Sequence, residues 1–256
     1  MSSQLDLHRA WRVDVSFSEL NGDISNLQRA PLFVRWTMAP NTMVLFYQTH
    51  SPYARKVLVA AHELGLAARI RIIHQETSPT SRNDDVFRQN PLGKVPVLIR
   101  DDSPPIFDSD VICAYFDTLH DGDKLAPSHG EARWRALTLQ ALAQGMNDCG
   151  IALRWETVRR PEPLRYQPLK DGYAAKLIES FDWLENQMQQ PGAVDLGQIA
   201  VATCLSWLEF RDLPSFRPGR PALSTWFDDF CERASMKATP LTGDTVDEPV
   251  IAETRK

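Results

Sequence analysis

The sequence lacks a long uninterrupted apolar run, because none of its stretches approaches the ~18 residues that a membrane span needs. It also lacks an excess of positive charge, since 28 Lys and Arg stand against 33 Asp and Glu, for a formal net charge of −5. Nucleic acid and anionic membranes are therefore poor candidates for the main partner. The 256 residues are 43% hydrophobic, which is ordinary for globular proteins and suits two packed domains.

Cysteine is scarce, and its spacing forms no Cys-x-x-Cys pair. The four cysteines lie far apart in apolar stretches of helical character, at Cys113, Cys149, Cys204 and Cys231. We expect buried, reduced thiols in a cytoplasmic protein. The six histidines also lack the spacing of metal ligands, so the sequence predicts no metal site.

The first 42 residues lack the features of a targeting segment. They contain neither a basic start followed by an apolar core nor the shortage of acids typical of a mitochondrial transit peptide. Four arginines balance four acidic residues there, and no periodic apolar face is present. We predict a poorly ordered N-terminal extension over residues 1–42.

Between Met43 and about His120 the pattern alternates strands and helices. After an apolar strand over Val44–Gln48, Ser51-Pro52 predicts a helix start, because serine caps well and proline suits the first helical position. The other expected elements are a strand over Arg69–His74, a short helix within Ser81–Gln89, a strand over Val95–Ile99, a turn at Asp101–Pro104, a strand at Ile106–Phe107 and a helix over Ser109–Leu119. This βαβαββα order implies a mixed sheet flanked by helices.

After Pro127 only helical periodicity remains. The expected helices span Glu131–Thr157, Leu169–Gln189, Asp195–Phe210 and Ala222–Ala234. The third begins with Asp195-Leu196-Gly197-Gln198, an acidic form of the capping box. We therefore predict an α/β domain over residues 43–120, a linker over 121–130, an all-helical domain over 131–236 and a disordered tail over 237–256.

Pro96 stands inside a strand-like segment, although proline cannot donate to a sheet ladder. One interpretation is a cis Val95-Pro96 bond, which turns the Val95 amide and carbonyl outward to pair with a peptide-like ligand. The other is a trans proline at the first residue of a strand. The spacing alone does not choose between them.

Two predicted helix starts carry hydroxyl groups. Ser51 follows a strand at a helix N-terminus, where converging N–H groups favour an anion such as a thiolate. Asp108-Ser109 begins another helix, where the acid and the hydroxyl suit a ligand with both an ammonium and a carboxylate group. For Ser51, simple capping is the commoner role of a serine in such a place. For Asp108-Ser109, simple capping is an equally good explanation.

The segments that hold these residues, at 49–56, 90–98 and 107–116, read THSPYARK, NPLGKVPVL and FDSDVICAYF. In order and spacing they resemble the glutathione S-transferase superfamily over about residues 43 to 235. In particular they resemble bacterial glutathione-transferase-like proteins of unassigned class with a Ser-Pro-x-x-Arg-Lys helix start. The resemblance implies a thioredoxin-like N-terminal domain that binds glutathione, an all-helical C-terminal domain that binds the second substrate, and a homodimer.

The resemblance also implies roles for single residues. The Val95 backbone pairs with the cysteinyl unit of glutathione, with Pro96 cis. Asp108 and Ser109 hold the γ-glutamyl end, and Lys94 lies near the glycyl carboxylate. The family usually has Glu-Ser where this chain has Asp108-Ser109, one methylene shorter.

Ser51 is the expected catalytic hydroxyl. His50 takes its place in some alignments and is expected to line the glutathione site, and Thr49 offers a second hydroxyl. The wall for the second substrate is expected from the first long helix and its neighbour, with candidates at Met146, Ile151, Arg154, Trp155 and Tyr166.

The implied function is a glutathione S-transferase that activates the thiol as a thiolate for attack on a small hydrophobic electrophile, without a metal. Two alternatives stay open. One is a binding or assembly protein that kept the fold without turnover. The other is a glutathione enzyme of the thiol-transferase or peroxidase type, for which the sequence offers no cysteine between Met43 and Cys113.

Overall fold

The computed structural model describes residues 42–101, 103–188 and 192–243. Apart from Thr42, the expected N-terminal extension lies outside these residues. The first half consists of β1 (Met43–Tyr47), α1 (Pro52–Glu63), η2 (Ala67–Arg69), β2 (Ile70–His74), α2 (Asp84–Gln89), β3 (Val97–Arg100), β4 (Ser103–Ile106) and α3 (Ser109–Phe116). The expected βαβαββα order is confirmed, with the short 3-10 turn η2 added.

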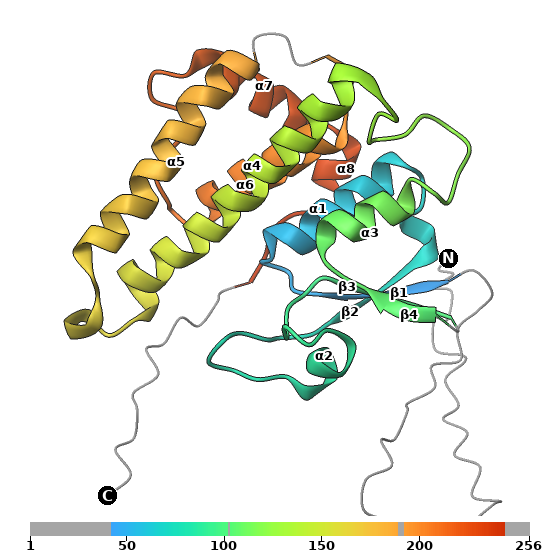
Figure 1. Ribbon diagram of the computed structural model, residues 1–256, viewed down its shortest axis with the longest axis horizontal. Helices are drawn as coiled ribbons and strands as arrows, with labels where there is room; N and C mark the ends of the chain where they lie inside the picture. The colour runs from blue at the N-terminus through green and yellow to red at the C-terminus, as the bar shows by residue number, and fades with distance from the viewer. Residues whose placement is uncertain (1–41, 102, 189–191, 244–256) are drawn as a thin grey trace, which may run out of the picture. The chain divides into compact units, whose positions relative to one another are not determined.

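The four strands form one mixed sheet in the order β2-β1-β3-β4. β1 is parallel to β2 and antiparallel to β3, and β4 is antiparallel to β3. The helices α1 and α3 lie side by side on one face of the sheet, and α2 lies on the other (Figure 1). Alternation along β1 explains the two layers, because Leu45 belongs to the main core while Val44 and Phe46 belong to a small cluster with Val86 of α2.

β4 differs from the prediction. It spans Ser103–Ile106, so it begins inside the expected turn and contains Pro104 and Pro105. A proline can occupy a strand at the edge of a sheet, where its missing N–H faces no partner, and β4 is an edge strand. The carbonyl of Pro104 accepts a hydrogen bond from Arg100 Nη2 at 2.8 Å.

The second half is helical. It consists of α4 (Gly130–Arg154), the π-helical turn η3 (Trp155–Arg159), the 3-10 turn η4 (Glu162–Leu164), α5 (Gln167–Gln187), α6 (Leu196–Phe210), α7 (Pro221–Cys231) and α8 (Ala234–Lys237). The four predicted long helices are present, but the last one stops at Cys231, since Arg233 adopts an extended backbone before α8 begins. None of the helices in the described ranges combines the length and apolar character that crossing a membrane requires.

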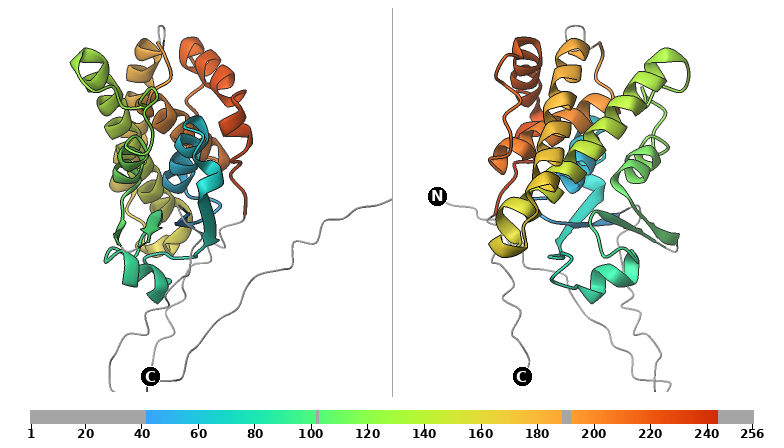
Figure 2. Two further views of the ribbon diagram at one scale, coloured as in Figure 1. Left: turned by 90° about the vertical axis from the view of Figure 1, so that its right-hand side faces the viewer. Right: turned by 60° about the vertical axis from the view of Figure 1, so that its left-hand side comes forward.

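α6 is buried along most of its length and packs closely on α4 (Figure 2). A Cβ added at Gly197 would stand 2.4 Å from the Ala136 carbonyl oxygen, so only glycine permits this approach. The predicted cap is confirmed, because Asp195 Oδ1 accepts from the Gln198 N–H at 2.8 Å. Burial raises the pKa of Asp195, and the hydrogen bond from the Gln198 N–H opposes that rise.

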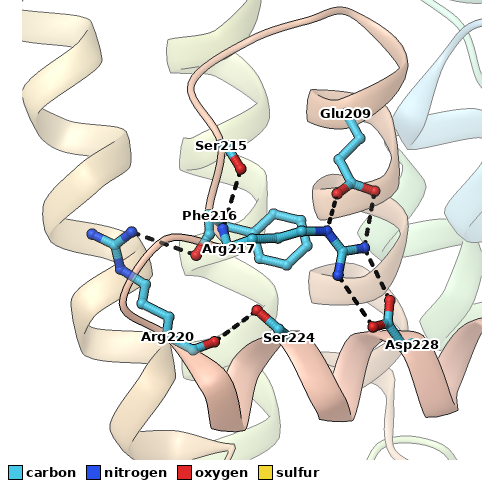
Figure 3. A network of polar contacts seen from close by, with 7 residues as sticks. All are labelled: Glu209, Ser215, Phe216, Arg217, Arg220, Ser224 and Asp228. Carbon is cyan, nitrogen blue, oxygen red and sulfur yellow. Dashed lines mark hydrogen bonds and ion pairs between the residues drawn. The ribbon is translucent and has the colours of Figure 1, made fainter.

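Arg217 ties α6 to α7 through two carboxylates (Figure 3). Its Nε donates to Glu209 Oε1 at 2.5 Å, and its Nη2 donates to Asp228 Oδ1 at 2.9 Å. These hydrogen bonds, that to Glu209 foremost, raise the pKa of Arg217. The same guanidinium lies 4.9 Å from the ring of the fully buried Phe216. The network therefore holds the α6–α7 connection against both helices.

The chain beyond α8 is described as far as Gly243. Thr239 is buried, and its hydroxyl donates to the Ser235 carbonyl at 2.9 Å. Leu241 packs against the main core. Residues 237–243 thus make contacts that the expectation of a disordered tail from residue 237 did not include, while residues 244–256 lie outside the described ranges.

Candidate functional site

Three segments singled out in the sequence meet at one edge of the sheet, namely the end at which β1 and β4 stop and β3 begins. β1 and β3 are antiparallel with Phe46 opposite Val97, so the residues after β1 lie beside those before β3. β4 and β3 are antiparallel with Leu98 opposite Ile106, so the residues after β4 reach the same edge. The helices α1 and α3 both begin there, which directs two helix N-termini toward one place.

The Val95–Pro96 peptide bond is cis, which is the interpretation that the family resemblance implied. Val95 lies just before the paired part of β3 and is 7% exposed. The loop that leads to it is held by two side chains: Asn90 Nδ2 donates to the Lys94 carbonyl and Thr77 Oγ1 donates to the Gly93 carbonyl, each at 2.9 Å. The Lys94 side chain itself is exposed at the edge of this loop.

Ser51 is the N-cap of α1. Its Oγ accepts from the Ala54 N–H at 3.2 Å, and its side chain lies in a buried position. Capping occupies a lone pair of the hydroxyl and leaves the proton to be donated. The capping role and the thiolate-binding role that the sequence left as alternatives are therefore compatible in this geometry.

The start of α3 is built differently. Asp108, which is exposed, is the N-cap, and its Oδ1 accepts from the N–H groups of Asp110 and Val111 at 3.0 and 3.4 Å. Ser109 is the first helical residue, and its side chain is fully buried. The Ser109 Oγ has no hydrogen-bond partner among the described residues. A buried hydroxyl without a partner is costly, which makes Ser109 a candidate ligand-binding group.

Polar contacts that the sequence did not reveal join α1 to α3 and α4. Lys56, whose side chain is buried, pairs with Asp110 of α3 and donates to Gln144 of α4 at 3.3 Å. The Tyr53 hydroxyl donates to Asp148 of α4. Burial, and next the Asp148 hydrogen bond, raise the pKa of Tyr53, so its phenol stays protonated. Lys56 therefore links α1 to α3 and α4.

His50 sits beside Ser51 with its side chain 14% exposed and its Nε2 3.9 Å from Glu76 Oε2. Burial lowers the pKa of His50, Glu76 opposes this, and the positive charges of Arg211 and Arg154 lower it further. The imidazole is therefore neutral at pH 7, where it adds no positive charge to the site.

The residues proposed from the sequence for the second-substrate wall lie in different surroundings. Met146 is 2% exposed and belongs to the core, so its assignment to a pocket was wrong. Tyr166, 61% exposed, lies before α5. Ile151 packs partly on the core, and Trp155 carries the Arg159 guanidinium 4.2 Å from its ring. Arg154 is the last residue of α4, and its positive charge is one of those that lower the pKa of His50.

All four cysteines are free thiols. Cys113 and Cys204 are buried, as expected, whereas Cys149 and Cys231 are half-buried. Burial raises the pKa of all four thiols, that of Cys113 to about 12. Within the described ranges, no cluster of three His, Cys, Asp or Glu side chains has the arrangement of a metal site.

Comparison with known protein families identifies the family to which this arrangement belongs. Residues 50–119 match the glutathione S-transferase N-terminal domain and residues 167–229 match the glutathione S-transferase C-terminal domain. The chain belongs to the glutathione S-transferase superfamily. The mixed sheet with its helices is accordingly the thioredoxin-like domain of this superfamily, and α4–α8 form its helical domain.

Other members of the glutathione S-transferase superfamily are similar over most of the chain. A glutathione transferase family member from Pseudomonas fluorescens Pf-5, crystallised with bound glutathione, is 35% identical, with a TM-score of 0.76 over 79% of this chain and 100% of that chain. A glutathione S-transferase from Methylobacillus flagellatus KT with glutathione bound is 30% identical, with a TM-score of 0.69 over 78% of this chain and 100% of that chain. The uncharacterized GST-like protein YibF of Escherichia coli is 28% identical over 194 residues, covering 74% of this chain and 94% of YibF.

Proposed function

We propose that this protein is a glutathione-dependent transferase that binds glutathione at the sheet edge and activates its thiol for attack on a hydrophobic electrophile. The observation that carries the proposal is the Ser109 hydroxyl, fully buried at the start of α3 and without a partner among the described residues. Two similar proteins crystallised with glutathione support the choice of ligand.

Glutathione is held along the edge by the groups that the sequence singled out. The Val95 backbone pairs with the cysteinyl unit, and the Ser109 hydroxyl at the N-terminus of α3 takes the γ-glutamyl carboxylate. Both cap bonds of Asp108 use Oδ1, and we assign its Oδ2 to the γ-glutamyl ammonium. Lys94, exposed beside the loop, is assigned to the glycyl carboxylate.

Ser51 activates the thiol by donating its own hydroxyl proton in a hydrogen bond to the sulfur, while the thiol proton is released to solvent. A free thiol has a pKa near ~8.5, so only ~3% is thiolate at pH 7. A hydrogen bond to a charged acceptor contributes roughly 1.5–3 kcal/mol and a helix N-terminus roughly 0.3–1 kcal/mol more. Since one pKa unit is about 1.4 kcal/mol, a fall of about two units is within reach. About three quarters of the bound thiol is then ionised at pH 7.

The thiolate attacks an electrophilic carbon, a sulfur–carbon bond forms, and the leaving group departs with its bonding electrons. Ser51 keeps its proton throughout. His50, neutral at pH 7, lines the site beside the thiol. The electrophile is assigned to the region between α1 and the C-terminal part of α4, with Ile151 and Arg154 as candidates for its wall.

We also propose that the protein acts as a homodimer through α3 and α4. Val111 of α3 is 51% exposed and Trp134 of α4 is 60% exposed. A cavity of about 550 Å³ between these helices is lined by Val111, Ala114 and Leu137. Sedimentation should give a dimer for the wild type and a monomer for Trp134→Glu, and a monomeric wild type would refute this part.

A binding protein without turnover is the second candidate, since the proposed glutathione site is the same in either case. The test is a screen of the purified protein with glutathione against haloaromatic, epoxide, hydroperoxide and aryl-ether substrates. We expect thioether formation with at least one class, a strong loss of rate in Ser51→Ala and a loss of glutathione binding in Ser109→Ala. Tight glutathione binding without turnover of any class would favour the binding protein, and absence of binding would refute both.

A further inference from the structure

The segment Arg233–Gly243 runs antiparallel along α1 and contacts it from one end to the other. At the C-terminal end of α1, Arg233 Nη2 donates to Glu63 Oε2 at 2.7 Å and Ser235 Oγ donates to Glu63 Oε1 at 2.5 Å. Near the N-terminal end of α1, the Met236 carbonyl accepts from Arg55 Nη2 at 3.2 Å. Beyond the start of α1, the Thr242 N–H donates to the Thr49 carbonyl at 3.2 Å.

The last of these contacts falls on the turn that carries Ser51. This turn closes with a hydrogen bond from the Ser51 N–H to the Gln48 carbonyl at 3.1 Å. Its first residue is fixed from the β2–α2 loop, because Gln48 Nε2 donates to Glu76 Oε2 at 3.0 Å and to the Thr77 carbonyl at 2.9 Å. The peptide between Thr49 and His50 is fixed from the other side by Thr242.

Gly243 allows the segment to lie this close to the turn. Its φ of +93° is one that residues with a side chain rarely adopt. A Cβ added there would stand 3.1 Å from Thr49 Oγ1, tighter than an ordinary contact. The approach of residues 242–243 to the turn therefore depends on glycine, both because of the positive φ and because a Cβ would stand too close to Thr49.

We propose that Thr242, through its backbone N–H, is a positioning residue for the Ser51 hydroxyl. This inference rests on the proposed function of Ser51. The thiolate hydrogen bond depends on the direction of the Ser51 side chain, which follows from the orientation of the peptide planes just before it. Fixing the Thr49 carbonyl fixes the first of those planes. The C-terminal segment thereby becomes part of the catalytic architecture without touching substrate.

The contact is first tested without glutathione. Thr242 is exposed, so its amide hydrogen should exchange quickly unless the Thr49 carbonyl holds it. We expect the Thr242 amide to be protected in the full-length protein. Exchange at the rate of an unstructured peptide would overturn the contact and the inference with it.

The effect on the thiol is tested with a proline and a matched control. Thr242→Pro removes the N–H, whereas Thr242→Ala retains it. The ionisation of bound glutathione is followed by thiolate absorbance against pH. A neutral hydrogen bond contributes a modest free energy, so the acid dissociation constant of the bound thiol should fall about 2- to 10-fold in Thr242→Pro. Thr242→Ala should titrate like the wild type.

A second pair keeps the test decisive where Thr242→Pro does not fold. Gly243→Ala pushes the segment away from Thr49, and Gly219→Ala introduces a Cβ at a similar positive φ with nothing within 4 Å. Only Gly243→Ala should weaken the thiol ionisation. If the wild type lowers the thiol pKa while Thr242→Pro and Gly243→Ala titrate like it, the positioning role is refuted. If the wild type itself does not lower that pKa, the proposed role of Ser51 is refuted as well.

Discussion

The starts of α1 and α3 lie at the same edge of the sheet and each carries a serine, yet the two serines are prepared in different ways. Ser51 is the cap of α1 and accepts an N–H from within its own helix. Ser109 stands one residue inside α3, where Asp108 takes over the capping. Its hydroxyl is therefore buried with no partner in the described part of the chain. One serine contributes to the fold before any ligand arrives, and the other does not.

This difference separates two kinds of site residue. A capping hydroxyl retains its proton and is fixed in direction, which suits stabilisation of a charge that develops on the ligand. A buried hydroxyl without a partner is costly in the free protein and gains when a ligand reaches it, which suits affinity. Ser51 should therefore control thiol ionisation, and Ser109 should control how tightly glutathione binds.

Ser109→Ala should give the largest effect. A lost hydrogen bond to a carboxylate corresponds to roughly 1.5–3 kcal/mol, so the Kd for glutathione should rise about 10- to 100-fold. The melting temperature should stay equal or rise slightly, because the buried hydroxyl has no partner in the free protein. Titration calorimetry and thermal melting measure the two quantities. Unchanged affinity, or a large loss of stability, would show that Ser109 serves the fold.

Ser51→Ala should act on a different quantity. The pKa of bound glutathione should rise by about one to two units, with little change in affinity at acidic pH, because the hydrogen bond is made mainly to the thiolate. Loss of the cap should also destabilise the protein by about 1 kcal/mol, measured by denaturant unfolding. If Thr49→Ala or His50→Ala shifts the titration instead, the activating group is the neighbour.

Ser51→Cys sharpens the assignment. A cysteine at a helix N-terminus has a lowered pKa, so the variant should form a mixed disulfide with glutathione disulfide and gain thiol-transferase activity. Mass spectrometry detects an adduct of one glutathione. The matched control Ser109→Cys places a thiol one residue inside α3. Adduct formation at both positions alike would remove the proposed difference between the two helix starts.

Asp108→Asn should have a smaller effect. Asparagine caps a helix as well as aspartate does, so α3 should keep its start and the melting temperature should change little. Only the attraction to the γ-glutamyl ammonium is lost, and for an exposed pair this is about 0.2–1 kcal/mol. We expect the Kd for glutathione to rise about 2- to 5-fold. A rise as large as that of Ser109→Ala would place the main binding contribution at the cap.

His50→Gln should have the smallest effect, seen in the pH dependence of stability. The pKa of His50 is lowered in the folded protein, so the unfolded chain binds more protons below about pH 6.5, and stability falls as the pH falls through that range. The variant should lose less melting temperature between pH 7.5 and 5.5 than the wild type, and the exposed His62→Gln should behave like the wild type. The thiol titration should not move. Equal acid sensitivity of His50→Gln and the wild type would contradict the burial of a neutral imidazole.

The elements of the site were predictable where the signal is local. Ser51-Pro52 and the Asp195 cap each indicate a helix start from neighbouring residues. For Pro96 the spacing left the cis and trans interpretations open, and the family resemblance implied the cis bond that the structure has. The expected helix over Ala222–Ala234 failed at its end. There Arg233 leaves the helix and pairs with Glu63, a partner 170 residues away.

Long-range pairs account for most of what the sequence did not reveal. The sequence around Lys56 gives no sign that Asp110 is its partner, because the two residues are far apart in the chain. Ser109 and Ser51 carry the same sequence signal, a serine at a helix start, and only their burial and hydrogen-bond partners in the structure distinguish them. The Asn-Pro-x-Gly spacing did contain a usable signal for Asn90, since that residue closes the loop ahead of Val95 through the Lys94 carbonyl.

The reversed run of residues 233–243 along α1 has a consequence for the order of synthesis. The segment that carries Ser51 leaves the ribosome early, whereas the groups that contact Glu63, Arg55 and Thr49 are among the last of the described chain to be made. A growing chain can fold its sheet and α1 while these partners are still absent. The turn before Ser51 therefore acquires its final set of contacts only after Thr242 has been made, so that a chain terminated before this residue lacks them.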